Sequence, residues 1–439
     1  MTTKKDFLKK FSIYAVGNIS SKLIMFLLYP VMTFYLSPEE LGPFDVVLSM
    51  AIWLGTLAML NMRDGAFRFI MVNDKKVFQR VLKLFMNILL WNAILLTIGA
   101  SVIYFTGIDL FFNPYLIVLF FLSFNFFEVY QQIIRGEGET KLYVTANIIS
   151  AFLIAIITIL LLKATDLKAN SLVIAYTVSK LLAALYVEMV HPIIFRKREK
   201  FNDSTDDNYS AKRILLYSLF LLPANLAITG IENWGRLFIL SDLGEYWVGI
   251  YAIVLKFGNI FFVLTAIYQQ TWQECAIRDY DTANRNQYFT KYFNNYLIFL
   301  TLLVVAITGG VQLFYKLLMA PEYYESVKYI PFQLFSIMFF ALSSFLRLGY
   351  ECSFQVNRAM YSALLATLVS FVLNAYLVQY WGILGSVISN IVAGLTMFVY
   401  RFIEVRRYFI IKLNKLGLLA IIILIMIIVW ILSFNNLYW

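Results

Sequence analysis

Charged side chains are scarce along this chain. Asp, Glu, Lys and Arg together make up 14% of its 439 residues, whereas 61% of the residues are hydrophobic. A water-soluble domain covers itself with polar groups, so this balance excludes an ordinary soluble protein and is typical of a chain whose solvent is lipid. The sequence also contains 40 Phe and 29 Tyr residues, which can form aromatic belts at the two membrane interfaces.

Cysteine and histidine are almost absent. The two cysteines, Cys275 and Cys352, do not form a disulfide framework and have no metal-site spacing, so we expect neither a metal nor a cofactor. The single histidine, His191, precedes Pro192 at a predicted helix end, where an interfacial role fits better than that of a ligand or proton carrier. The chain also lacks a GxxxxGK[ST] phosphate-binding loop, which excludes ATP hydrolysis of that type.

Long hydrophilic segments are also missing, apart from RKREKFNDSTDDNYSAKR near the middle of the chain. A spanning helix needs about 20 mostly apolar residues. On this basis we expect spans at 10–35, 41–62, 80–106, 112–135, 140–163, 170–195, 212–240, 244–271, 289–317, 326–350, 357–380 and 382–404. A thirteenth apolar segment is expected at 416–434. The first span is preceded by MTTKKDFLKK and is too long for a signal-peptide core, so we expect it to remain as a signal anchor.

The spans on the two sides of the polar segment repeat one another in order. The matched pairs are Tyr14 with Tyr217, Leu41-Gly42-Pro43-Phe44 with Val248-Gly249-Ile250-Tyr251, Pro114 with Pro331, and Tyr143 with Tyr361. Their offset only grows along the chain, as insertions in the second half would make it. Because each half holds an even number of spans, both halves enter from the same side, which gives parallel repeats.

The sequence therefore predicts an all-α integral membrane protein with two parallel-repeat six-helix bundles around a central cavity and an extra C-terminal helix. The expected organisation is an N-terminal lobe at 1–195, a cytoplasmic linker at 196–211, a C-terminal lobe at 212–408 and an additional hydrophobic segment at 409–439.

The basic residues predict the orientation of the chain in the membrane. Most of the 36 Lys and Arg residues fall in loops on the side of the N-terminus, and the predicted outer loops hold only Lys163, Lys168, Lys316 and Lys328. This bias places the N-terminus in the cytoplasm. It also explains the net charge of +10 without a nucleic-acid partner, because the positive charges are spread over membrane loops.

Apart from basic residues near span ends, which are grouped with the loops, five basic residues lie further inside predicted spans, where a charge is costly and by default faces a partner or a water-filled cavity. Arg236 has Glu232 four residues before it, and Arg347 has Glu351 four residues after it, so each can be neutralised within its own helix. Lys180 has Glu188 two turns away, the nearest acid on the same face.

Lys22 and Lys256 have no acid within one turn of their own helices, and both lie near the middle of their spans. We expect Lys22, Lys256, Lys180 and Arg236 to form a cationic cavity that attracts an anion. Pairing of Lys22 or Lys256 across helices with Asp45 or Glu128 is the alternative. Glu128, which precedes Tyr130, Gln131 and Gln132, is a candidate for binding sugar hydroxyls or for proton or ion coupling, as is Asp45. A salt bridge across helices is an equally good reading of Glu128.

The opening FSIYAVGNISSKLIMFLLYPVMTFYLSPEELGPFDVV resembles the first two helices of the polysaccharide-specific transporters, the Wzx-type flippases. YQQIIRGEGETKLY, between the fourth and fifth helices, is also similar to the pattern of that family. The resemblance covers about residues 8–408 in two six-helix halves. The thirteenth segment departs from the usual twelve or fourteen helices and leaves the C-terminal topology open.

This resemblance implies the fold of the multidrug/oligosaccharidyl-lipid/polysaccharide exporter superfamily, with a central cavity and alternating access. It implies a flippase that moves polyprenyl-pyrophosphate-linked oligosaccharides to the outer leaflet of the bacterial inner membrane for O-antigen, capsule or lipopolysaccharide synthesis. The implied partners are the lipid-linked substrate, membrane lipid and the polysaccharide polymerase machinery. Family members are described with a cationic cavity, and Lys22, Lys180, Arg236 and Lys256 would suit that cavity by their helices.

Two other functions are weighed against this one. A multidrug or cation antiporter of the same superfamily would favour acidic residues in its cavity, whereas the predicted spans offer more lysine than acid without a partner on the same helix. A membrane enzyme, such as a glycan polymerase or ligase, commonly carries its catalytic group on a substantial outer loop. Every predicted outer loop is short, so we expect no catalytic activity.

Overall fold

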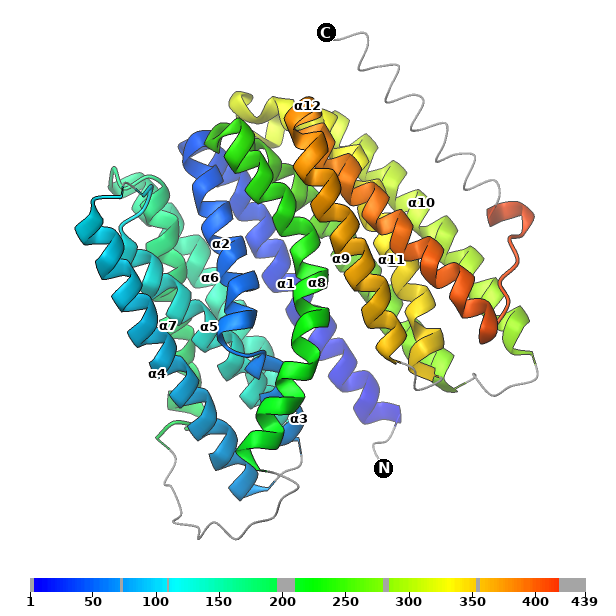
Figure 1. Ribbon diagram of the computed structural model, residues 1–439, viewed down its shortest axis with the longest axis horizontal. Coiled ribbons are helices and arrows are strands. Elements are labelled where there is room, and N and C mark those ends of the chain that lie inside the picture. Colours follow the sequence, from blue (N-terminus) through cyan, green and yellow to red (C-terminus); the bar gives the residue numbers. More distant parts are fainter. Residues whose placement is uncertain are drawn as a thin grey trace. The chain divides into compact units, whose positions relative to one another are not determined.

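The computed structural model describes residues 4–71, 74–108, 110–195, 210–278, 284–352 and 356–417. Every regular element in these ranges is a helix, which confirms the predicted all-α class (Figure 1). The elements are α1 (Lys4–Tyr35), α2 (Pro38–Ala58), α3 (Met62–Ile70), α4 (Lys75–Thr106), α5 (Pro114–Gly136), α6 (Thr140–Ala164), α7 (Ala169–Val190), α8 (Ala211–Leu243), α9 (Glu245–Arg278), α10 (Arg285–Leu318), η2 (Pro321–Lys328), α11 (Ile330–Cys352), α12 (Val356–Glu404) and η3 (Val405–Arg407).

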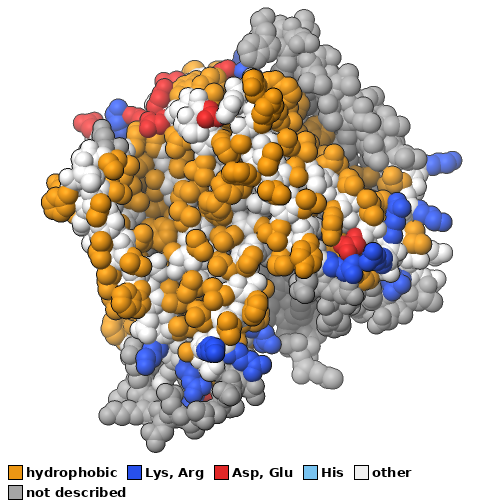
Figure 2. Space-filling view, in the orientation of Figure 1, with side chains coloured by type: hydrophobic (Ala, Val, Ile, Leu, Met, Phe, Trp, Pro, Cys, Tyr) orange, Lys and Arg blue, Asp and Glu red, His pale blue; other side chains and the backbone are white. Residues whose placement is uncertain are grey.

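Ten of the described helices are long and apolar enough to cross a membrane. One of them, α12, contains two of the spans expected from the sequence, joined at Gly382 with φ 57° and ψ −135°. This backbone conformation favours glycine, because a side chain there would clash with its own main chain. Figure 2 shows hydrophobic side chains over the flanks of the helices, with Lys and Arg gathered near helix ends.

The chain divides into two compact units. Unit 1 comprises residues 1–36 and 43–226, and unit 2 comprises residues 37–42 and 227–439. The division falls inside both α2 and α8. The linker expected at 196–211 lies outside the described residues for most of its length, so the predicted domain boundaries remain a prediction. The C-terminal segment expected at 416–434 also lies outside them from residue 418 onward.

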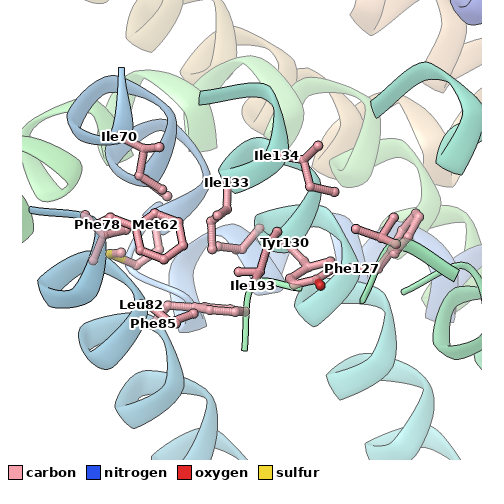
Figure 3. Close-up of a cluster of buried hydrophobic side chains, with 14 of the residues drawn as sticks. Met62, Ile70, Phe78, Leu82, Phe85, Phe127, Tyr130, Ile133, Ile134 and Ile193 are labelled. Carbon is pink, nitrogen blue, oxygen red and sulfur yellow. The ribbon is translucent and has the colours of Figure 1, made fainter. Parts of the chain in front are cut away.

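In unit 1, α5 packs against α3, α4 and α7, while α6 packs against α1 and α7. Apolar residues of α5 recur every three or four positions and place Phe127, Tyr130 and Ile134 in a buried core (Figure 3). Side chains from α3, α4, α6, α7 and α8 also belong to this core. The helix begins at Pro114 because Asn113 Oδ1 accepts a hydrogen bond from Tyr115 N at 2.9 Å.

The helix α3 was not predicted, because nine residues are too few for a membrane span. It follows a sharp corner at Leu60 and Asn61, whose φ angles of 50° and 53° are left-handed. Buried side chains along one face hold it on α5, while the side chains of Arg63 and Arg68 are exposed. The guanidinium of Arg135 on α5 lies 4.3 Å from the ring centre of Phe67, which fastens α3 further.

The helix α7 ends at Val190, five residues before its expected end. Pro192 has no backbone N–H and cannot continue the helix. The Glu188 carboxylate instead accepts hydrogen bonds from Ile193 N, Ile194 N and Phe195 N, at 3.0, 3.0 and 2.9 Å, and from the hydroxyl of Tyr130. His191 Nε2 lies 2.9 Å from Glu137 Oε2, so the histidine ties the end of α7 to the end of α5.

Unit 2 is held together by aromatic rings and buried polar side chains. Trp272 of α9 stacks on Phe345 of α11, with ring centres 4.7 Å apart. After η3 the chain runs along α10, where Asn286, Thr290 and Asn294 lie four residues apart. These three side chains hydrogen-bond to the backbone at residues 410, 412 and 414, so they fix the segment that leads to the C-terminus.

Candidate functional site

A cavity of about 180 Å³ lies in unit 1 between α2, α3 and α5. Apolar side chains form part of its wall, and its polar lining residues are Thr56, Asn61, Arg63, Asn125 and Glu128. Because charged and amide side chains meet in a helical bundle that is otherwise apolar, this is the strongest candidate for a ligand site in the described part of the unit.

Asn125 fixes the wall of the cavity. Its Nδ2 donates to Ala51 O at 3.1 Å and to Phe121 O at 2.9 Å, which links α5 to α2. The amide can approach α2 so closely because residue 55 is glycine: a Cβ there would lie 2.1 Å from Asn125 Oδ1. The two helices are therefore held together at the cavity by one buried side chain.

The corner that carries Arg63 is held by α8. Asn225 Nδ2 donates to Asp64 Oδ2 at 2.7 Å and to Asn61 Oδ1 at 3.2 Å. Asn61 Nδ2 in turn donates to Ser218 O at 3.3 Å. The carboxylate of Asp64 is thereby used in positioning the corner, which leaves the neighbouring guanidinium of Arg63 to face the cavity.

The charged centre of the site consists of Glu128 and two cations from different helices. Glu128 Oε1 lies 3.6 Å from Lys180 Nζ of α7, and Glu128 Oε2 lies 3.4 Å from Arg63 NH1 of α3. The Lys180 side chain is 10% exposed, that of Glu128 24% and that of Arg63 55%. The three groups together carry one net positive charge when all are ionised.

Lys180 is further stabilised by aromatic rings. Its Nζ lies 4.6 Å from the ring centre of Phe127 and 5.1 Å from that of Phe124. The negative faces of these rings favour a cation in a place where water has little access. Lys180 is not among the residues that line the cavity, but it adjoins the cavity through its ion-pair partner Glu128, which is.

Of the six residues predicted for the site, the structure brings together Glu128 and Lys180. The contact is a salt bridge across helices, one of the two readings that the sequence left open for Glu128. Lys22 lies on α1 and the buried Asp45 on α2, both in unit 1.

The remaining two predicted cations, Arg236 on α8 and Lys256 on α9, belong to unit 2. A cavity shared by all the predicted cations, and the role of each, therefore remain predictions. The carboxylates of Glu232 and Glu351, expected to neutralise Arg236 and Arg347, lie outside the described side chains. Within the described part of the chain, no group of three or more His, Cys, Asp or Glu residues is placed to hold a metal.

Sequence reasoning missed Arg63, because it assigned this residue to a polar loop and not to a helix that faces a cavity. It also grouped Arg401, which lies near the end of the span expected at 382–404, with the loop charges, although the side chain is buried in unit 2. Arg401 donates from Nε to Ser362 Oγ at 2.8 Å, from NH1 to Ser343 O at 3.0 Å and from NH2 to Ala359 O at 3.3 Å. This set of partners indicates a structural role that joins α12 to α11.

Comparisons with known proteins agree with this architecture. The model of a family described as polysaccharide biosynthesis protein matches residues 7–272. No curated protein matches the sequence.

Among solved structures, a lipid II flippase MurJ in an inward closed conformation has a TM-score of 0.70 and 14% identity, covering 97% of this chain and 98% of that one. An inward-facing multidrug resistance transporter of the MATE family and the MOP superfamily has a TM-score of 0.65 and 14% identity, covering 90% and 98%. A MOP superfamily transporter from Pyrococcus furiosus, whose binding pocket is described as having reverse polarity, has a TM-score of 0.62 and 15% identity, covering 91% and 96%. At these identities the likeness shows the fold, the two-lobe fold of twelve helices.

Proposed function

The chain belongs to the polysaccharide biosynthesis protein family, and from this premise we propose that it is a flippase for lipid-linked oligosaccharides. It is a multi-pass membrane protein with the fold of the MOP superfamily. The substrate we assign to it is a polyprenyl-pyrophosphate-linked repeat unit, carried from the cytoplasmic to the outer leaflet for O-antigen, capsule or lipopolysaccharide synthesis. We place it in the bacterial inner membrane with a cytoplasmic N-terminus, working by alternating access without catalysis and supplying a polysaccharide polymerase.

The observation that supports this proposal is a pair of cations around Glu128: Arg63 lines the cavity of unit 1, and Lys180 lies behind the carboxylate. Arg63 and Lys180 come from separate helices and approach one carboxylate from two sides. Phosphate groups are bound well by a guanidinium and an ammonium group together, because one supplies a planar fork of donors and the other a compact charge. The amides of Asn61 and Asn125 hold the wall beside this pair, because they are hydrogen-bonded to α8, α2 and α5.

A cation antiporter is the second candidate, favoured by the presence of Glu128 in the cavity and by the likeness to multidrug transporters. The contacts of Glu128 weigh against it. The carboxylate already faces two basic groups, so a cationic drug would have to displace both of them from an oxygen pair that carries one negative charge.

A strain that lacks the gene tests the proposal. Lipid-linked saccharides and surface glycan are measured in the same cells, with the wild-type gene, Lys180→Met, or Lys22→Ala combined with Lys256→Ala supplied on a plasmid. The proposal expects loss of surface glycan with retention of polyprenyl-linked repeat units in the deletion strain, and poor restoration by both sets of variants at normal protein levels. Normal surface glycan in the deletion strain, with altered sensitivity to cationic compounds, would instead support the antiporter.

A further inference from the structure

Glu128 has an arrangement that a purely structural salt bridge does not need. Each of its two oxygens faces a different cation, at 3.4 and 3.6 Å, and the three side chains come from α3, α5 and α7. Direct hydrogen bonds between an ammonium or guanidinium group and a carboxylate measure about 2.7–2.9 Å. Both contacts of Glu128 are longer, so the carboxylate neutralises the cations without being locked to either of them.

Glu188, another carboxylate of the same unit, has the contacts of a structural group. Glu188 accepts hydrogen bonds from three consecutive backbone N–H groups and from the hydroxyl of Tyr130. Within the described part of the chain, the contacts of Glu128 are those with Arg63 and Lys180. A carboxylate held only by two loose ion pairs can leave them when a better anion arrives.

The two cations differ in their access to a ligand. Half of the Arg63 side chain is exposed and it lines the cavity, whereas Lys180 is almost fully covered and lies against two phenyl rings. An entering anion therefore meets Arg63 first and reaches Lys180 only after Glu128 has moved aside. A phosphate group that carries more than one negative charge matches the two cations better than one carboxylate does.

From this geometry we propose that Glu128 is an internal counter-ion, which the anionic head group of the substrate displaces from Arg63 and Lys180. The inference rests on the proposed function and assigns to Glu128 a role other than binding sugar or carrying a proton. Lys180 is then never left without a negative partner, so its buried charge is compensated in both the empty and the loaded state. The ligand gains only the difference between its own contacts and those of Glu128, so it is also released readily.

Competition by Glu128 weakens binding of the anion but speeds its release. Glu128→Gln keeps the shape of the side chain but removes the competing charge. We expect this variant to bind an anion more tightly and to transport its substrate more slowly, because the anion would leave Arg63 and Lys180 less readily. Without ligand the variant would be less stable than the wild type, since Lys180 would lose its counter-charge.

The experiment measures binding of inorganic pyrophosphate to the purified full-length protein in lipid nanodiscs, together with the thermal shift that pyrophosphate produces. The variants are Glu128→Gln, Glu128→Asp and Lys180→Met. The matched control is Glu139→Gln, since Glu139 is an exposed carboxylate of the same unit outside the cavity. We expect Glu128→Gln to bind on the order of tenfold more tightly than the wild type. Glu128→Asp should fall between the two, Lys180→Met should bind more weakly, and Glu139→Gln should be unchanged.

Equal or weaker binding by Glu128→Gln, with the wild type binding pyrophosphate, overturns the role of Glu128 and leaves the proposed function standing. If Glu128→Gln does not fold, Glu128→Asp decides, because affinity at or below that of the wild type contradicts displacement. Absence of pyrophosphate binding by the wild type overturns this inference by itself. The proposed function fails separately, when cells that lack the gene make normal surface glycan.

Discussion

The backbone of Gly249 lies directly against that of Pro38. A Cβ added at Gly249 would be 2.0 Å from Pro38 O, and one added at Gly42 would be 2.3 Å from Glu245 O. Pro38 and Glu245 are the first residues of α2 and α9, and each glycine comes four residues later. Both pairs are related by the offset of 207 residues at which the two halves of the sequence match. The contact is therefore reciprocal, and it places repeat-related helix starts against each other within unit 2.

The close approach of these two backbones predicts a steric clash in Gly249→Ala. The neighbouring atoms belong to the backbone of Pro38, which cannot rotate away as a side chain would. We expect a loss of about 1–3 kcal/mol of stability, the usual cost of overpacking. Thermal unfolding of the purified protein measures it. The control is Gly309→Ala in α10, where an added Cβ has no atom within 4 Å. Equal midpoints for the two variants would contradict the close approach.

The Glu188 carboxylate predicts a local change at the end of α7. Glu188→Ala removes the acceptor for Ile193 N, Ile194 N and Phe195 N. Hydrogen bonds to a charged group each contribute about 1.5–3 kcal/mol. We expect the three amides to exchange with deuterium faster in the variant, while the core of unit 1 stays protected. Hydrogen exchange followed by mass spectrometry provides the test, with Glu139→Gln as the control. Unchanged protection of residues 193–195 would show that other contacts hold this turn.

The buried hydrogen bonds of Arg401 predict that even a conservative substitution at this position destabilises unit 2. Lysine keeps the charge but cannot donate in three directions from a planar group to Ser362, Ser343 and Ala359. We expect Arg401→Lys to lower the free energy of unfolding by about 1–3 kcal/mol, because buried acceptors lose their donors. Arg406→Lys is the matched change, since Arg406 is exposed and lies over the ring of Phe402. A larger loss for Arg406→Lys would contradict this reading.

The helices of this fold could be predicted from hydropathy because each must be apolar over a membrane thickness. The same rule failed for α3, because its nine residues are too few to cross a membrane. Its amphipathic pattern could be interpreted only once its buried face was known. The start of α3 depends on left-handed Leu60 and Asn61, which no hydropathy window detects.

The candidate site was less accessible to sequence reasoning. The salt bridge between Glu128 and Lys180 depends on how α5 and α7 are rotated about their axes, which spacing along one helix does not determine. Arg63 and Arg401 were both counted as loop charges because they lie close to predicted helix ends. Their different environments arise from packing: Arg63 opens onto a cavity, whereas Arg401 is enclosed by α11 and α12.

Arg63 gives the sharpest prediction for transport, because α3 carries two exposed arginines and only one of them lines the cavity. If the cavity binds an anionic head group, Arg63→Gln removes a charge-assisted contact of about 1.5–3 kcal/mol, which corresponds to a loss of ten- to a hundredfold in affinity. Arg68→Gln removes the same charge from the same helix at a position outside the cavity lining. In the deletion strain we expect Arg63→Gln to restore surface glycan poorly and Arg68→Gln to restore it almost fully, at equal protein levels. Equal impairment by both variants would mean that the basic surface as a whole attracts the substrate, and the cavity would lose its special role. Full restoration by Arg63→Gln would leave Lys180 as the cation on which binding in unit 1 depends.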